Sequence, residues 1–324
     1  MERQLVLREV VKPKPREFKD EINEIILSLN LPKYSNKTGN KQFTQAQKLT
    51  CVIVYFKSKL SLREFCDYFN QETMWPRWLM LKYKLTKSSL NRWIQEFSLD
   101  FIKQILELTI KNDSPEIMGI DGTGISSKFK SSYYQKRLKD FGLNPKSPYH
   151  KLDIICDLQG KKKIFDFTFA MKQYNDKKQA KRLFNRFKIK NITIIGDRGY
   201  YYYYLFSKMK EMNSIFIVPP INTGGKEIHN NIVRRQFQQT FYDYQDIYPL
   251  RNNVEGVFFA LKRTILTKIV SRKVTSKRRE VAFKIVIYNM KKNISAQFLF
   301  FKYCMFFNKN YLIFNGKSIN LFKN

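Results

Sequence analysis

The sequence predicts an α/β protein, in which helices flank a mixed sheet and an all-helical region precedes it. Up to about residue 110, apolar residues recur at three- and four-residue spacing, the period of an amphipathic helix. From about residue 116 the pattern changes to short apolar runs bounded by turn residues, alternating with further helical segments. With 43% hydrophobic residues and 28 Phe among 324 residues, the chain can build a substantial core around these elements.

The helical region follows a basic, proline-stiffened arm. Ser61 with Glu64 fits a capping box at a helix start. The polar segment that contains Arg92 suits a helix-turn-helix whose last helix enters the DNA major groove, with Arg92 as a candidate DNA contact. A plain helical bundle would show the same pattern. The expected helices are 17–29, 43–56, 61–68 and 87–97.

The region after residue 116 predicts the sheet. Three strands are followed by helix, strand, helix and strand, an order typical of a mixed α/β sheet. We therefore divide the chain into a helical region at 1–110 that is a candidate helix-turn-helix DNA-binding domain, an α/β domain at 111–293, and an aromatic-rich tail at 294–324. The expected strands are 117–120, 152–156, 163–170, 192–195 and 214–218, and the expected helices are 177–187, 203–211, 250–271 and 277–292.

The net charge points to a polyanionic partner. Sixty Lys and Arg against 27 Asp and Glu give a formal charge of +33, far more than solubility requires. Nucleic acid is the commonest such partner, because binding phosphates releases counterions. A Lys-rich composition bias would explain part of the same excess.

Several other classes of protein are disfavoured. The four cysteines are scattered without a C-x-x-C pair, which argues against zinc fingers and a disulfide framework. The most apolar stretch, 298–307, is broken by Lys302 and is too short to span a bilayer, and no signal-peptide pattern appears. We expect a cytoplasmic, prokaryotic protein that associates with the nucleoid when on DNA and has no membrane partner.

Two aspartates follow apolar runs at glycine-containing turns. Asp121 precedes Gly122, and Asp197 is followed two residues later by Gly199. Glycine lets the backbone turn sharply as it leaves a sheet, so both carboxylates are expected at strand ends, where they would converge on one cation. Taken singly, each is more readily an ordinary turn residue.

A third acid lies on a predicted helix. Arg251, Glu255 and Lys262 are spaced by four and seven residues, which places them within roughly 40° of one another on one helical stripe. A solvated helix face with i, i+4 ion pairs would look similar. The apolar residues of this segment form a separate face that can pack on the sheet, namely Val254, Val257, Phe258 and Leu261.

These blocks carry a family resemblance. Tyr248, Arg251, Glu255 and Lys262 match every fixed position of the Tyr-x2-Arg-x3-Glu-x6-Lys signature of one branch of insertion-sequence transposases. The two earlier acids resemble that family's Asp-x-Thr and Asp-x-Gly-Tyr blocks. The family carries an Asp-Asp-Glu (DDE) catalytic triad on an RNase H-like fold, so the resemblance implies that fold for the predicted α/β domain and makes it the catalytic domain.

The resemblance implies a DNA transposase that cleaves insertion-sequence ends and joins them to a target in cut-and-paste transposition. Asp121, Asp197 and Glu255 would be the catalytic metal ligands, holding two Mg²⁺ or Mn²⁺ ions. Carboxylates suit such ions, and two metal ions about 4 Å apart clamp the attacking and leaving oxygens. The implied partners are double-stranded DNA, as terminal inverted repeats and as target, and a second copy of the chain in a homodimeric synaptic complex.

The resemblance also implies residues that grip DNA. Tyr248, Arg251 and Lys262 would hold the DNA end near the scissile phosphate, which agrees with the phosphate-binding chemistry of Arg and Lys. Segment 126–150 interleaves basic and aromatic residues as a strand-gripping surface requires, although a solvated loop would do the same. Its candidate DNA contacts are Lys128, Lys130 and Arg137.

Two alternative functions remain open. One is a stand-alone RNase H-like nuclease, which would cut DNA without joining it. The other is a non-catalytic DNA-binding protein derived from a transposase.

Overall fold

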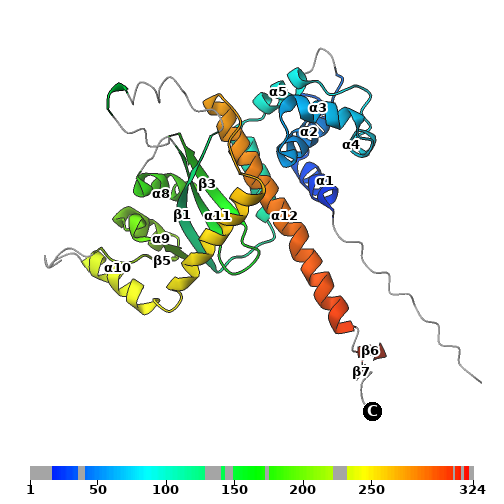
Figure 1. Cartoon of the computed structure of the whole chain (residues 1–324). Coiled ribbons are helices and arrows are strands. Elements are labelled where there is room, and N and C mark those ends of the chain that lie inside the picture. Colours follow the sequence, from blue (N-terminus) through cyan, green and yellow to red (C-terminus); the bar gives the residue numbers. More distant parts are fainter. Residues whose placement is uncertain are drawn as a thin grey trace, which may run out of the picture.

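The computed structural model is helical in its amino-terminal part and α/β beyond it (Figure 1). The amino-terminal helices are α1 (Phe18–Leu29), α2 (Gln45–Ser58), α3 (Leu62–Gln71), α4 (Met74–Trp78), α5 (Lys87–Glu96) and α6 (Leu99–Ile110). The structure describes residues 17–35, 41–127, 140–142, 149–171, 175–221, 232–308, 311–314 and 317–320.

The helix starts follow the capping chemistry of the sequence. Ser61 precedes α3, its backbone N–H donates to Glu64 Oε2 at 2.9 Å, and the Glu64 N–H donates to Ser61 Oγ at 3.3 Å. This confirms the predicted capping box, which satisfies amide groups that the first helical turn leaves unpaired. Thr44 caps α2 in the same way with Gln47.

The described strands form a five-stranded mixed sheet in the order β3-β2-β1-β4-β5. β1 is antiparallel to β2 and β2 to β3, whereas β1 is parallel to β4 and β4 to β5. The predicted α/β fold, a mixed sheet flanked by helices and preceded by a helical region, is therefore confirmed. The strands are β1 (Ile117–Ile125), β2 (His150–Asp157), β3 (Ile164–Ala170), β4 (Thr193–Gly196) and β5 (Ile215–Ile217).

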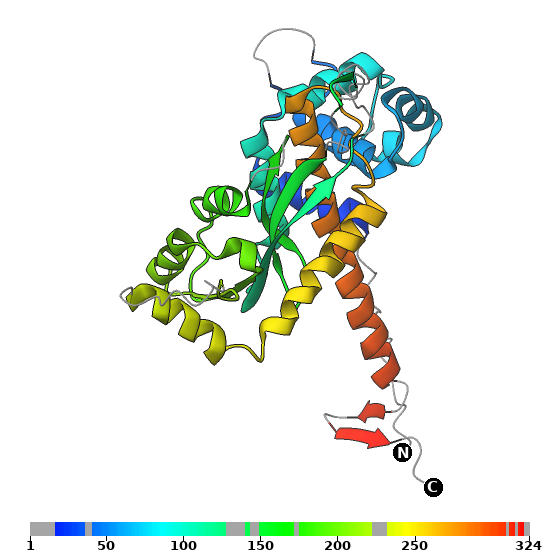
Figure 2. The ribbon, with the colours of Figure 1, turned by 60° about the vertical axis from the view of Figure 1, so that its left-hand side comes forward.

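Helices cover both faces of the sheet (Figures 1 and 2). On one face, α8 (Asp176–Phe184) and α9 (Tyr203–Glu211) share a core with alternate residues of β1. On the other face, α11 (Asn252–Thr264) and α12 (Val274–Asn308) share a larger core with the sheet and the amino-terminal helices. The remaining elements are α10 (Ile232–Asp243), the short 3-10 helices η1 (Arg198–Tyr200) and η2 (Tyr248–Arg251), and a hairpin of β6 (Tyr311–Phe314) and β7 (Lys317–Asn320).

The helix α12 joins the two parts of the chain. It packs against α2, α6 and β3, and its Phe283 ring stacks on Phe56 of α2 with centroids 5.3 Å apart. The boundary expected at residue 293 falls inside this continuous helix. The amino-terminal helices and one face of the sheet are therefore built on one hydrophobic core.

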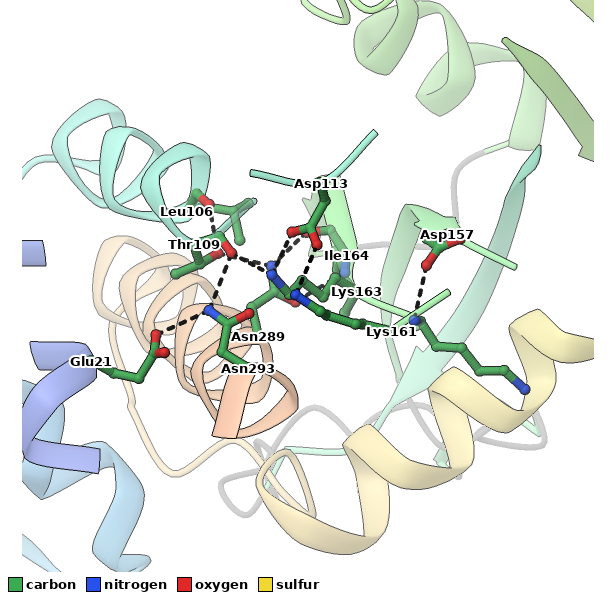
Figure 3. A network of polar contacts seen from close by, with 11 residues as sticks. Glu21, Leu106, Thr109, Asp113, Asp157, Lys161, Lys163, Ile164, Asn289 and Asn293 are labelled. Atoms are coloured by element: carbon green, nitrogen blue, oxygen red, sulfur yellow. Dashed lines mark hydrogen bonds and ion pairs between the residues drawn. The ribbon is translucent and has the colours of Figure 1, made fainter. Parts of the chain in front are cut away.

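A polar network fixes this junction (Figure 3). The fully buried Asn289 of α12 accepts a hydrogen bond from the Ile164 N–H at 2.9 Å and donates to the Ile164 carbonyl at 2.8 Å. Its amide also donates to Thr109 Oγ1 at 3.0 Å, and Lys163 Nζ donates to the Thr109 carbonyl at 2.7 Å. Asn289 thus satisfies the backbone of an edge strand that no further strand covers in the described sheet.

Some predicted boundaries differ from the structure. β1 runs to Ile125 instead of ending at residue 120, because its later residues pair with β2 as far as His150. The helix predicted over 250–271 ends at Thr264, and α12 is longer than predicted at both ends. The helices α4, α6 and α10 and the terminal hairpin were not among the predicted elements. Among the described residues, no helix is both long and apolar enough to cross a bilayer.

Candidate active site

Asp121 and Asp197 occupy equivalent positions on two parallel strands. The last pair between β1 and β4 is Ile120 with Gly196, so an aspartate is the next residue after each member of this pair. Adjacent strands lie about 4.8 Å apart, which sets the two residues side by side where the strands separate. The prediction that Asp197 follows the end of its strand is confirmed. The same prediction for Asp121 is wrong, because β1 continues past it through its pairing with β2.

The helix α11 can reach Asp121 because β1 has no side chain at residue 119. A β-carbon on Gly119 would lie only 2.4 Å from Val254 Cγ2. Side chains alternate along a strand, so Asp121 projects from the face that Gly119 leaves open to α11. The apolar face predicted for this helix is buried as expected, at Val254, Val257, Phe258 and Leu261.

The predicted basic and acidic stripe lies along β1. Arg251 Nη2 is 3.2 Å from Asp121 Oδ2, and Arg251 Nη1 is 3.8 Å from Glu255 Oε1. Further along the helix, Lys262 Nζ donates a hydrogen bond of 2.6 Å to Thr123 Oγ1, on the same strand face as Asp121. The structure thus brings Arg251, Glu255 and Lys262 to the strand that carries the first acid.

Burial and neighbouring acids raise the proton affinity of Asp121. Burial is the largest influence and raises the pKa of Asp121, while the Asp197 and Asp176 carboxylates raise it further. The Gly122 N–H, which donates to Asp121 Oδ1 at 2.7 Å, and the Arg251 guanidinium both act to lower it. A cation placed here would be stabilised by several carboxylates.

Within the described residues, no three His, Cys, Asp or Glu side chains lie close enough to hold a metal ion together. The side chain of Glu255 is 67% exposed and lies against Arg251. The donor atoms themselves are carboxylate oxygens, which suit Mg²⁺ or Mn²⁺. One guanidinium already contacts both Asp121 and Glu255, so the two carboxylates lie on either side of a single positive charge.

Comparison with known proteins identifies the family of the chain. The family model of the transposase DDE domain matches residues 113–290, which is more than half of the chain. The chain belongs to the DDE transposase family. A solved piggyBac transposase synaptic complex with hairpin DNA is similar at 12% identity and a TM-score of 0.39, covering 90% of this chain and 78% of that one. No curated protein matches the chain at a significant level.

In this transposase, Tyr248 belongs to η2 and lies near Asp121 and Asp197. It is half-buried, and its ring packs edge-on against Phe241 of α10 with centroids 5.3 Å apart. Burial raises the pKa of Tyr248, Arg251 lowers it, and Asp197 raises it. The signature residue thus faces the same charges as the acids.

Sequence reasoning missed a polar network on the opposite face of the sheet. Asp153 of β2 is fully buried, accepts a hydrogen bond from the Tyr200 hydroxyl at 3.1 Å, and lies 3.5 Å from Lys151 Nζ. Lys151 also pairs with Asp176 at the start of α8. The network links β2 to α8 and to the turn after Asp197.

Two glycines beside the acids accommodate this network. A β-carbon on Gly122 would lie 2.6 Å from Asp153 Oδ1. A β-carbon on Gly199 would lie 2.8 Å from Asp176 Oδ2 and 3.0 Å from Asp197 Oδ1. The pairing of Gly122 with Asp153 reveals the network. This register could not be predicted from the sequence of either strand alone.

We expect Asp153→Asn to stabilise the transposase, with a gain that grows as the pH rises. Burial raises the pKa of Asp153 to about 7, so the native state holds a proton between about pH 4 and pH 7 that the unfolded state has released. Stability therefore falls as pH rises through this window, and asparagine removes that loss. In urea unfolding, the advantage of the variant should increase by about 2 kcal/mol between pH 5.5 and pH 8. A constant advantage would contradict the role of burial, and Asp67→Asn, at an exposed position, is the control.

The other predicted DNA contacts lie elsewhere. Arg92 is exposed on α5, on the amino-terminal helices, and its Nε is 3.7 Å from Glu96 Oε1. Lys128, Lys130 and Arg137 fall outside the described residues.

Proposed function

We propose that the protein is an insertion-sequence transposase that cleaves DNA ends and joins them to a target by cut-and-paste transposition. The observation that carries this proposal is the register of β1 and β4, which sets Asp121 next to Asp197 beneath the helix that bears Glu255. A solvated ion pair on a surface helix would not require a glycine at position 119, where the missing side chain allows α11 to pack close to the strand.

Asp121, Asp197 and Glu255 would hold two Mg²⁺ or Mn²⁺ ions. When bound, such ions activate the attacking hydroxyl and neutralise charge on the leaving oxygen. Arg251 would then exchange its carboxylate partners for a phosphate, which its planar guanidinium can bind through two hydrogen bonds. Lys262 and Tyr248 would hold the DNA end on either side of Arg251.

The DNA substrate would be a pair of terminal inverted repeats held by a homodimer. Synapsis of two ends needs two active sites, and a chain with a formal charge of +33 can hold both the ends and the target. An RNase H-like nuclease would share the acids and the charge but would lack the joining reaction.

A strand-transfer assay with pre-cut ends tests this function. Duplexes that carry the inverted repeat flanking the gene and end in a 3′-hydroxyl are mixed with supercoiled plasmid, protein and MgCl₂. We expect covalent joining of the duplex to the plasmid. Hydrolysis of DNA without joined product would overturn the transposase proposal in favour of the nuclease.

A further inference from the structure

Three adjoining hollows form a groove that leads from β1 to the amino-terminal helices. It begins at a hollow beside the end of β1 that is lined by Lys262 and Thr267. Thr267 also lines a second hollow, which continues into a third of about 700 Å³ through shared walls at Tyr55, Lys59 and Val270. Figure 2 shows the linker between α11 and α12 passing beside the amino-terminal helices.

The groove is strongly basic. Its lining contains seven Lys or Arg residues and one acid, Glu64, whose carboxylate is engaged in capping α3. The side chains of the basic residues are exposed, except for half-buried Lys262 and for Lys284, which is buried in an ion pair. The exposed ones are Lys59, Lys87, Lys268, Arg272 and Lys273.

The walls of the groove are held in place by a buried acid. Glu280 of α12 is fully buried, and its carboxylate accepts hydrogen bonds from the backbone N–H of Val270 at 3.0 Å and of Ser271 at 2.8 Å. Lys284 neutralises Glu280 at 2.6 Å and donates to the Lys268 carbonyl at 3.1 Å. The linker therefore has a fixed path that presents Lys268, Arg272 and Lys273 to solvent.

The opposite wall is fixed to the same helix. Gln95 near the end of α5 donates to Ser276 Oγ at 2.9 Å, and Arg279 Nε donates to the Phe97 carbonyl at 2.7 Å. The face of α5 that borders the groove carries Lys87 and Asn91. Arg92, the contact expected from the sequence, borders a different hollow.

We propose that this basic groove binds the phosphate backbone of the double-stranded DNA that leads away from the cleaved end. The inference rests on the proposed function, because it assumes that the scissile end lies at Asp121, next to the Lys262 end of the groove. A row of exposed cations along a fixed path complements the dense negative charge of a duplex, which carries one phosphate per roughly 1.7 Å of axis. Charge of this kind holds DNA in register without reading its sequence.

The test compares two triple variants of the full chain with equal loss of charge. The groove variant is Lys87→Gln, Lys268→Gln and Lys273→Gln. The control variant is Lys188→Gln, Lys190→Gln and Lys210→Gln, at exposed positions remote from the groove lining. Both are made in the Asp121→Asn background, and thermal melting confirms that both fold.

Binding of a duplex with one flanking inverted repeat is measured by fluorescence anisotropy over a series of salt concentrations. The groove variant should bind at least about tenfold more weakly than the control, and the slope of log K against log salt should be smaller by about 2 to 3. Equal affinities and slopes for the two triple variants would overturn the proposal.

Failure of this inference is distinguishable from failure of the proposed function. If wild-type protein joins ends but the two triple variants bind alike, the groove assignment is wrong and the transposase assignment stands. If no joining occurs but the groove variant binds weakly, the groove assignment stands alone.

Discussion

Asp121→Asn should lower the rate of DNA end cleavage by at least about a thousandfold, because it removes a charged ligand from the point where the chemistry occurs. The register of β1 and β4 makes Asp121 the residue that shares its position with Asp197, and Arg251 contacts it directly. Loss of the Asp121 carboxylate should therefore affect both the acid beside it, Asp197, and the arginine that contacts it, Arg251. The measurement is single-turnover cleavage of an end duplex in MgCl₂.

The fold and the binding of DNA should survive this change. Burial raises the pKa of Asp121, so the ionised side chain is not a source of stability that asparagine would remove. We expect the Kd for the end duplex to change by less than about threefold, since that affinity comes from many phosphate contacts. Asp67→Asn controls for the loss of one negative charge. Cleavage by Asp121→Asn within tenfold of wild type would contradict the assignment.

Glu255→Gln should also abolish cleavage. This variant distinguishes the two interpretations of the helix stripe, which are a solvated ion-paired face and a face that carries a metal ligand. As one partner of an exposed i, i+4 pair with Arg251, Glu255 should contribute less than about 1 kcal/mol to stability. As a metal ligand, it should be required for cleavage even though the variant has the same shape. We expect unchanged urea unfolding and a rate lower by at least about a thousandfold.

The chain contains a matched control for this variant. Arg92 and Glu96 form another i, i+4 pair, with 3.7 Å between Nε and Oε1. Glu96→Gln removes this pair, together with the 3.1 Å ion pair that Glu96 forms with Lys48, and should cleave at the wild-type rate because it lies remote from the acids. If Glu255→Gln cleaves as well as Glu96→Gln, the Glu255 stripe is only a solvated helix face.

Local patterns predicted much of this fold because period and capping are local properties. The apolar periods located most helices and all five strands of the sheet, and the capping box at Ser61 is present as expected. The third acid block was predictable for the same reason, since a helix places residues four and seven apart on one side.

Features that depend on pairing between strands could not be predicted in this way. Gly122 and Gly124 suggested a turn after Asp121, but backbone hydrogen bonds to β2 keep this segment extended. The role of Gly119 depends on which helix packs against it, and the sequence around Gly119 does not indicate that this helix carries Val254. Asp153 was missed because only the register reveals that it lies beside Gly122.

The course of the chain after α11 also depends on distant contacts. The helix predicted to run to residue 271 ends at Thr264, and Glu280 holds the backbone of Val270 and Ser271 in a non-helical path. This same interruption turns Arg272 and Lys273 into a wall of the basic groove. A helix would have placed them on a different surface.

The most direct test of the central claim is to count the metal ions held by the three carboxylates. Binding of Mn²⁺ is followed by the loss of the electron paramagnetic resonance signal of the free ion, in the presence of a DNA end duplex. Wild-type protein should bind two ions per chain, and Asp121→Asn, Asp197→Asn and Glu255→Gln should each bind fewer ions or bind them at least about tenfold more weakly. Equal stoichiometry and affinity in the wild type and all three variants would show that these carboxylates do not hold the metal.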